Sequence, residues 1–180
     1  MARYVGVDDL FLLRLAAGDG IAESLVDATM AAGYHIIIPP AAYQAIQDEA
    51  DKAEDSDARN FACMALSNIN VWGFLSLELT DTQKFYTDRA AERMIEAGIL
   101  AESSLSKARM ITQLGADGVH TDLFITGHSE LCGTNTYLLH FIVQSRDLRV
   151  FPVKEVDALY KEIMKLQERM RASSGLAHSQ

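Results

Sequence analysis

Short apolar segments that alternate with helix-length segments constrain the fold of this chain more than any other feature of its sequence. The apolar segments are residues 3–7 (RYVGV), 35–38 (HIII), 68–79, 122–126 and 148–153. Strands that are apolar on both faces are typical of a parallel sheet covered on both sides, and helices between them supply the cover. The sequence therefore predicts an α/β protein, a three-layer α/β/α sandwich with a mostly parallel central sheet.

The segments between these strands carry helix signals. Thr80 and Gln83 have the spacing of a capping box, and glycines such as Gly33 and Gly98 stand where helices should stop. Helices are expected over residues 9–20, 21–32, 40–66 with a break near Ser56, 80–97, 101–114, 135–147 and 154–170. No repeat or Gly/Ser linker divides the chain, which predicts one domain over residues 1–172 and a disordered tail at 173–180.

The charge balance limits the partners that the chain can attract. Formal net charge is −9, from 25 acidic and 16 basic residues, which disfavours passive attraction to phosphate backbones. A role in nucleic-acid binding needs a local basic patch, and no run of basic residues supplies one. Cys63 and Cys132 are too few for an extracellular disulfide scaffold, and we expect both to be buried as small apolar groups. The sequence shows no signal peptide and no apolar run of ~20 residues, so we expect a cytoplasmic protein that does not bind membranes.

Polar residues follow the ends of the expected strands, where functional sites form in open α/β sheets. Asp8 and Asp9 follow the first strand, and Gln44 lies in the first turns of the helix after the second. The fourth strand is followed by His128 and Glu130, and the helix that starts near Glu102 can point its first turn to the same edge.

Two of these residues allow more than one interpretation. Asp8 suits a hard cation such as Mg²⁺, but an Asp after a strand is equally typical of a helix N-cap, and one Asp can do both. We expect Asp9 to be its exposed partner in the helix cap. His128 can be a turn residue that makes a backbone hydrogen bond, or a ligand of a softer metal such as Mn²⁺ or Zn²⁺.

The order of elements resembles the PIN domain family. Four segments carry the resemblance: VGVDDLFLL near the N-terminus, IIIPPAAYQAI after the second strand, DLFITGHSEL around the fourth, and the late RVFPV strand. The resemblance covers roughly residues 3–160. It implies a PIN-like fold and the activity of that family, hydrolysis of RNA at a site where three or four carboxylates surround one or two metal ions.

The acidic motif that the resemblance implies is degenerate in this chain. Asp8 matches the first family acid, whereas the second position falls at Gln44 or Ala45. The third falls at Glu102 or Ser103, and the fourth at His128, with Glu130 close enough in sequence to turn inward instead. The resemblance thus implies Asp8 and Glu102 as catalytic residues, and Asp8, Glu102 and Glu130 as ligands of a weakly held Mg²⁺ or Mn²⁺.

We therefore expect a metal-dependent endoribonuclease of the toxin–antitoxin type with weakened activity. Its partners are then RNA or an antitoxin-like protein. The alternative is a non-catalytic PIN-like module that binds a protein or RNA through the former active-site cleft, and an unrelated flavodoxin-like or Rossmann-like domain is a third reading. A homodimer is also expected, because the helix over residues 154–170 has an apolar stripe, although the same stripe can instead cover the sheet.

Overall fold

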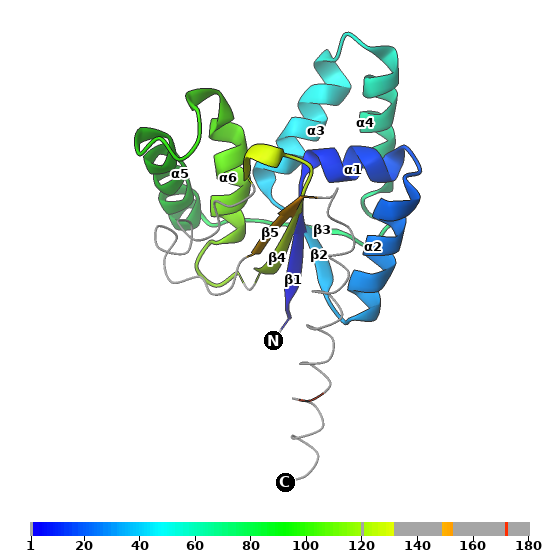
Figure 1. The fold of residues 1–180 in the computed structure, drawn as a ribbon, viewed down its shortest axis with the longest axis horizontal. Helices are drawn as coiled ribbons and strands as arrows, with labels where there is room; N and C mark the ends of the chain where they lie inside the picture. Colours follow the sequence, from blue (N-terminus) through cyan, green and yellow to red (C-terminus); the bar gives the residue numbers. More distant parts are fainter. Residues whose placement is uncertain (1, 120, 132–148, 153–171, 173–180) are drawn as a thin grey trace.

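The structure is a computed structural model that describes residues 2–119, 121–131, 149–152 and 172 (Figure 1). The elements in chain order are β1 (Tyr4–Val7), α1 (Asp9–Ala16), α2 (Gly20–Ala31), β2 (His35–Ile38), α3 (Pro40–Lys52), α4 (Ser56–Asn68), β3 (Leu75–Ser76), α5 (Asp81–Glu96), the 3₁₀ helix η1 (Glu102–Ser104), α6 (Leu105–Leu114), β4 (Thr121–Thr126), the 3₁₀ helix η2 (Ser129–Leu131) and β5 (Arg149–Pro152). The helices expected at 135–147 and 154–170, and the tail, lie outside the described residues. Among the described helices, none combines the length and the apolar character needed to cross a membrane.

All described strands are parallel and form one sheet in the order β3-β2-β1-β4-β5. The expectation of a parallel sheet with the first strand in a central position is confirmed. Val5 pairs with Ile36 of β2 on one side and with Leu123 of β4 on the other, and Val7 pairs with Ile125. Because β1 and β4 run side by side, the residues that follow Val7 and Ile125 meet at the same edge of the sheet.

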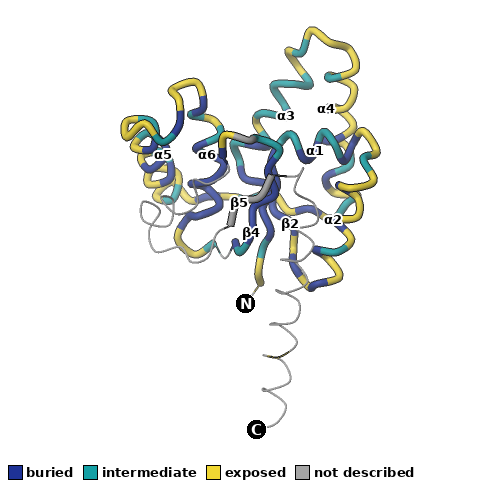
Figure 2. Tube along the Cα trace, viewed as in Figure 1, coloured by how far each residue is buried: buried dark blue, intermediate teal, exposed yellow. Residues whose placement is uncertain are grey.

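Strands β1, β2 and β4 are mostly buried, as their continuous apolar sequences predict, whereas both residues of β3 are exposed (Figure 2). Helices pack around them: α2 contacts β2, α1 contacts α2 and α4, and α6 contacts α3 and α5. In Figure 1, α1 and α2 lie on the side of β2, while α5 and α6 lie on the side of β4. The fold is therefore a mixed α/β domain in which the helices enclose a parallel sheet.

The third strand is much shorter than expected. Residues 68–79 are apolar and aromatic enough to indicate a strand, but only Leu75–Ser76 pair with β2. Helix α4 continues to Asn68, and a tight turn follows in which Gly73 has a φ of 75°. The N–H of Phe74 bonds to the carbonyl of Ile69 at 3.1 Å and closes this turn. The left-handed conformation that glycine allows at Gly73 thus closes the turn after α4, over residues whose side-chain composition alone favours a strand.

Two local predictions have opposite outcomes. The capping box of α5 is confirmed, because the N–H of Gln83 donates to the Thr80 hydroxyl at 3.2 Å and the Gln83 amide oxygen accepts from the N–H of Thr80 at 2.9 Å. The expectation that Cys63 is buried is wrong, since this side chain is exposed on α4. Ala62 and Ala65 form the buried face of α4, and their neighbour Cys63 consequently points outward.

Gly127, in the turn after β4, packs closely against α1, and a substitution there tests this packing. A Cβ at Gly127 would lie 2.6 Å from the Cβ of Leu10, which is too close without a shift of the backbone. We expect Gly127→Ala to lower the free energy of unfolding by about 1–3 kcal/mol, measured by urea denaturation, because overpacking separates the two elements.

Gly20→Ala is the matched control for this substitution. A Cβ at Gly20, the first residue of α2, meets nothing within 4 Å. This variant should be neutral or more stable by about 0.4–1 kcal/mol, since alanine restricts the unfolded chain. Equal losses in the two variants would contradict the close approach of the β4 turn to α1.

Candidate functional site

Asp8 stands at the point where β1 ends and α1 begins. Its backbone is extended, and its side chain is the N-cap of α1, with Oδ1 accepting a hydrogen bond from the N–H of Phe11 at 2.8 Å. The residue is fully buried, with an exposed fraction of 0%. The expectation that Asp8 caps the helix is therefore confirmed, while its role as a metal ligand stays a prediction.

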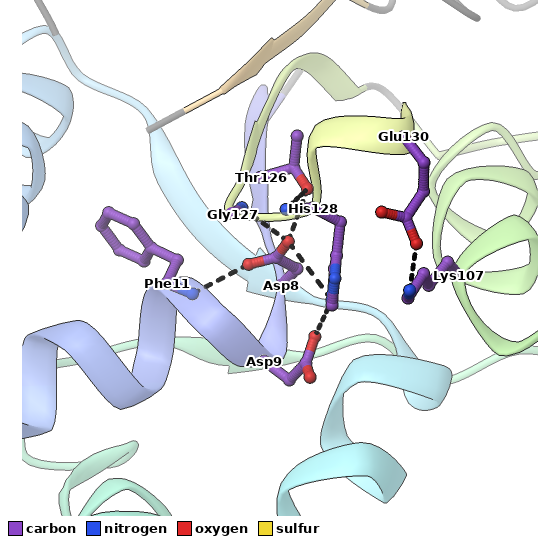
Figure 3. A network of polar contacts seen from close by, with 8 residues as sticks. All are labelled: Asp8, Asp9, Phe11, Lys107, Thr126, Gly127, His128 and Glu130. Carbon is purple, nitrogen blue, oxygen red and sulfur yellow. Dashed lines mark hydrogen bonds and ion pairs between the residues drawn. The ribbon is translucent and has the colours of Figure 1, made fainter. Parts of the chain in front are cut away.

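The second oxygen of Asp8 joins this corner to the end of β4 (Figure 3). Oδ2 accepts hydrogen bonds from the Thr126 hydroxyl at 2.6 Å and from the N–H of Gly127 at 2.9 Å. The Thr126 oxygen in turn accepts the N–H of His128 at 3.0 Å. One carboxylate thus binds the end of β1, the first turn of α1 and the turn after β4 together.

His128 and Asp9 form a second pair beside Asp8. Nε2 of His128 lies 2.7 Å from Oδ1 of Asp9 and 3.9 Å from Oδ2 of Asp8. The side chains of His128 and Asp9 are only 11% and 16% exposed. We expected Asp9 to be an exposed partner in the helix cap; instead it lies in the first turn of α1, partly buried against the imidazole.

The surroundings change the proton affinity of both Asp8 and His128. Burial, together with the charge of Asp9, raises the pKa of Asp8 to about 6, although hydrogen bonds from Thr126 and Phe11 act in the opposite direction. Burial alone would lower the pKa of His128, but the hydrogen bond to Asp9 and the charges of Asp9 and Asp8 outweigh it, so that this pKa is raised. His128 therefore holds its proton at higher pH than an exposed histidine does.

Asp8, Asp9 and His128 are arranged as ligands of one metal ion could be. One ligand atom from each of the three side chains lies within 4.8 Å of the others. Within the described part of the chain, no other group of three or more His, Cys, Asp or Glu side chains brings its ligand atoms this close together. Two carboxylate oxygens and an imidazole nitrogen suit Mn²⁺ or Zn²⁺ better than Mg²⁺, which prefers oxygen ligands alone.

The other expected site residues lie outside this group. Glu102 and Ser103 are exposed in η1, and the Gln44 amide donates to Asp48 within α3 at 3.1 Å. Glu130 pairs with Lys107 of α6, and the hydrogen bond from Lys107 lowers the pKa of the Glu130 carboxyl. The structure thus brings Asp8 and His128 together as expected and adds Asp9, whereas metal binding by Glu102 and Glu130 stays a prediction.

Sequence reasoning assigned Asp9 to the helix cap and did not identify Lys107. The register of the sheet supplies the signal for Asp9: Val7 lies opposite Ile125, so residues 8 and 9 fall beside the turn at 126–128. The local sequence around Lys107 contains no comparable signal, because its partner is 23 positions away.

Comparisons with known proteins identify no relative. No protein-family model, no curated protein and no solved structure matches the chain. Any functional proposal therefore depends on the geometry and chemistry of the site.

The raised pKa of Asp8 predicts a pH dependence of stability. Between its ordinary pKa of 3.8 and its value of about 6, the folded protein keeps a proton that the unfolded chain has lost. Raising the pH across this interval should therefore cost the folded state about 3 kcal/mol, because each pKa unit corresponds to about 1.4 kcal/mol. His128 adds a change of the same sign, since stability from its raised pKa is lost as the pH rises through that pKa.

Urea denaturation of wild type and Asp8→Asn, with EDTA present, measures this contribution between pH 4 and pH 7.5. Asparagine cannot ionise, so the stability of wild type relative to Asp8→Asn should fall as the pH rises. Parallel pH profiles of the two proteins would show that Asp8 has an ordinary pKa.

Proposed function

We propose that this chain is a PIN-like, metal-dependent endoribonuclease of weak activity, in which Asp8, Asp9 and His128 hold the metal ion. The observation that carries the proposal is the meeting of two carboxylates and an imidazole where the adjacent strands β1 and β4 end. This edge is where open parallel sheets bind their ligands. The strand–helix order and the central position of β1 support a PIN-like three-layer sandwich.

The three residues fit a divalent ion by the chemistry and spacing of their ligand atoms. Zn²⁺ binds imidazole nitrogen and carboxylate oxygen at about 2.0–2.2 Å in a tetrahedral arrangement, which separates the ligand atoms by about 3.4 Å. The 2.7 Å and 3.9 Å separations of His128 Nε2 from Asp9 and Asp8 are close to this requirement. A cation here would replace the proton that His128 and Asp9 share, and two carboxylates would balance its charge.

Each residue then has a distinct task. A bound ion would lower the pKa of a coordinated water and offset charge on the phosphodiester. Asp8 is a ligand with a fixed orientation, because Phe11, Thr126 and Gly127 hold both of its oxygens. Without an ion, Asp9 orients the His128 ring through Nε2. Binding would remove the proton from that atom, after which Nε2 and the Asp9 carboxylate would both act as ligands.

The same contacts account for the weak activity that we propose. Asp8 already accepts three hydrogen bonds, which leaves its oxygens less available to a cation. The described cluster has two carboxylates, whereas the family chemistry uses three or four, and Mg²⁺ needs negative charge to give up its water. Mn²⁺ should therefore be the better cofactor. Glu130 could add a charge only by leaving Lys107.

A non-catalytic binding module is the second candidate, and the direct contact between His128 and Asp9 favours it. A histidine cation paired with Asp9 at 2.7 Å satisfies the site without a metal ion. Such a site would keep the shape of a cleft for RNA or an antitoxin-like protein without hydrolysing it. The proposed homodimer contact through residues 154–170 lies outside the described residues and stays a prediction.

Calorimetric titration with Mn²⁺ and Mg²⁺ tests the metal site. We expect wild type to bind Mn²⁺ more tightly than Mg²⁺. Asp9→Asn and His128→Gln should each weaken Mn²⁺ binding by about tenfold or more, because each removes one of three ligands. Any cleavage of single-stranded RNA should fall in parallel.

Asp48→Asn is the control, because Asp48 is an acid on α3 that pairs with Lys52 and lies outside the cluster. It should bind Mn²⁺ as wild type does. Loss of Mn²⁺ binding in Glu102→Gln but not in Asp9→Asn would move the metal site to the carboxylates that the family resemblance implies. The absence of any metal binding by a folded wild-type protein would favour the non-catalytic module.

A further inference from the structure

A second charged pair lies beside the cluster of Asp8, Asp9 and His128 (Figure 3). Lys107, in the first turn of α6, forms an ion pair with Glu130 of η2. Their side chains are 30% and 38% exposed, so that both reach solvent at the edge of the site. The ion pairs Lys52–Asp48 and Lys84–Asp81, by contrast, each lie within one helix.

Lys107 is close enough to the cluster to act on it electrostatically. Its partner Glu130 follows His128 by two positions in the turn after β4, and the Lys107–Glu130 pair lies beside His128 (Figure 3). The side chain of Lys107 is partly exposed there, so an anion that approaches the cluster can reach it by displacing Glu130.

The negative charge of this chain opposes the binding of an anionic substrate, and a cation at the site would offset it. The protein carries a net charge of −9, and two of its carboxylates, those of Asp8 and Asp9, lie at the site itself. Without a metal ion, these carboxylates repel an RNA phosphate, and a neighbouring positive charge is needed to offset the repulsion. Lysine is a common phosphate ligand because its ammonium group donates three hydrogen bonds from a mobile point charge.

We propose that Lys107 contacts the phosphate of the RNA substrate next to the metal cluster, and that Glu130 holds Lys107 in place and competes with the phosphate for it. The inference rests on the proposed ribonuclease function and names a substrate-binding residue for it. Glu130 is then the group that an incoming phosphate displaces. Binding without metal depends on Lys107, whereas metal binding depends on Asp8, Asp9 and His128.

Binding of a fluorescent single-stranded oligouridylate in EDTA separates these two requirements. Lys107→Met should weaken binding about tenfold, as expected for the loss of a charge-assisted hydrogen bond. It should also reduce the slope of log affinity against log salt by about 0.7, the value for one phosphate contact on a single strand. Glu130→Gln should bind more tightly than wild type because it releases Lys107, and Lys107→Arg should keep most of the affinity.

Lys84→Met and Asp81→Asn are matched controls, since they make the same charge changes in an exposed pair on α5. Neither should change the salt slope, and exposed ion pairs contribute so little to stability that all variants should fold. Circular dichroism and thermal unfolding are the measurements that check the folding of each variant. If RNA affinity depends on Lys107 while Mn²⁺ does not bind Asp9 and His128, the phosphate contact stands and the metal-dependent function fails. If Lys107→Met binds RNA as Lys84→Met does, or wild type does not bind RNA, the inference is overturned.

Discussion

The buried carboxylate of Asp8 is the interaction on which the rest of this site depends. A buried carboxylate is costly unless hydrogen bonds compensate for its lost hydration. Here the hydroxyl of Thr126 and the N–H groups of Phe11 and Gly127 provide three of them. These donors come from the first turn of α1 and from the end of β4, more than a hundred positions along the chain. Asp8 therefore fixes where the central strands end relative to each other.

The same burial sets the chemistry that the site can perform. It raises the pKa of Asp8 to about 6, so that Asp8 loses its charge, and with it its strength as a ligand, as the pH falls below that value. The neighbouring His128 keeps its proton through its contact with Asp9, so protons occupy the cluster where a cation would sit. A divalent ion has to displace these protons, and metal binding should consequently compete with acid. This competition is a physical reason for the low Mg²⁺ affinity that we propose.

The sequence is sufficient to predict the elements whose signals are local. The continuous apolar character of β1, β2 and β4, the capping box at Thr80 and the break between α3 and α4 all follow from residues within a few positions of each other. The position of Asp8 at the carboxyl edge of the sheet follows from the strand order. The predicted length of β3 was wrong, because α4 and the turn that Gly73 closes occupy the residues before Leu75, whose composition favours a strand.

The side-chain pairs of the site could not be predicted in the same way. The contact between Asp9 and His128 joins residues 119 positions apart, and it requires the register of β1 against β4. The pair of Lys107 with Glu130 requires the placement of α6 against the turn after β4. The family resemblance led to Glu102 because it aligns sequence positions, whereas the cluster is defined by which side chains meet in space.

The most direct test of the central claim is anomalous diffraction from a crystal of the protein soaked with Mn²⁺. Our account predicts one anomalous peak within coordination distance of the carboxylates of Asp8 and Asp9 and of Nε2 of His128. It also predicts that the ion pair between Lys107 and Glu130 remains intact beside the peak. A peak bound by Glu102 or Glu130 without Asp9 and His128, or an intact His128–Asp9 contact with no peak at saturating Mn²⁺, would contradict it.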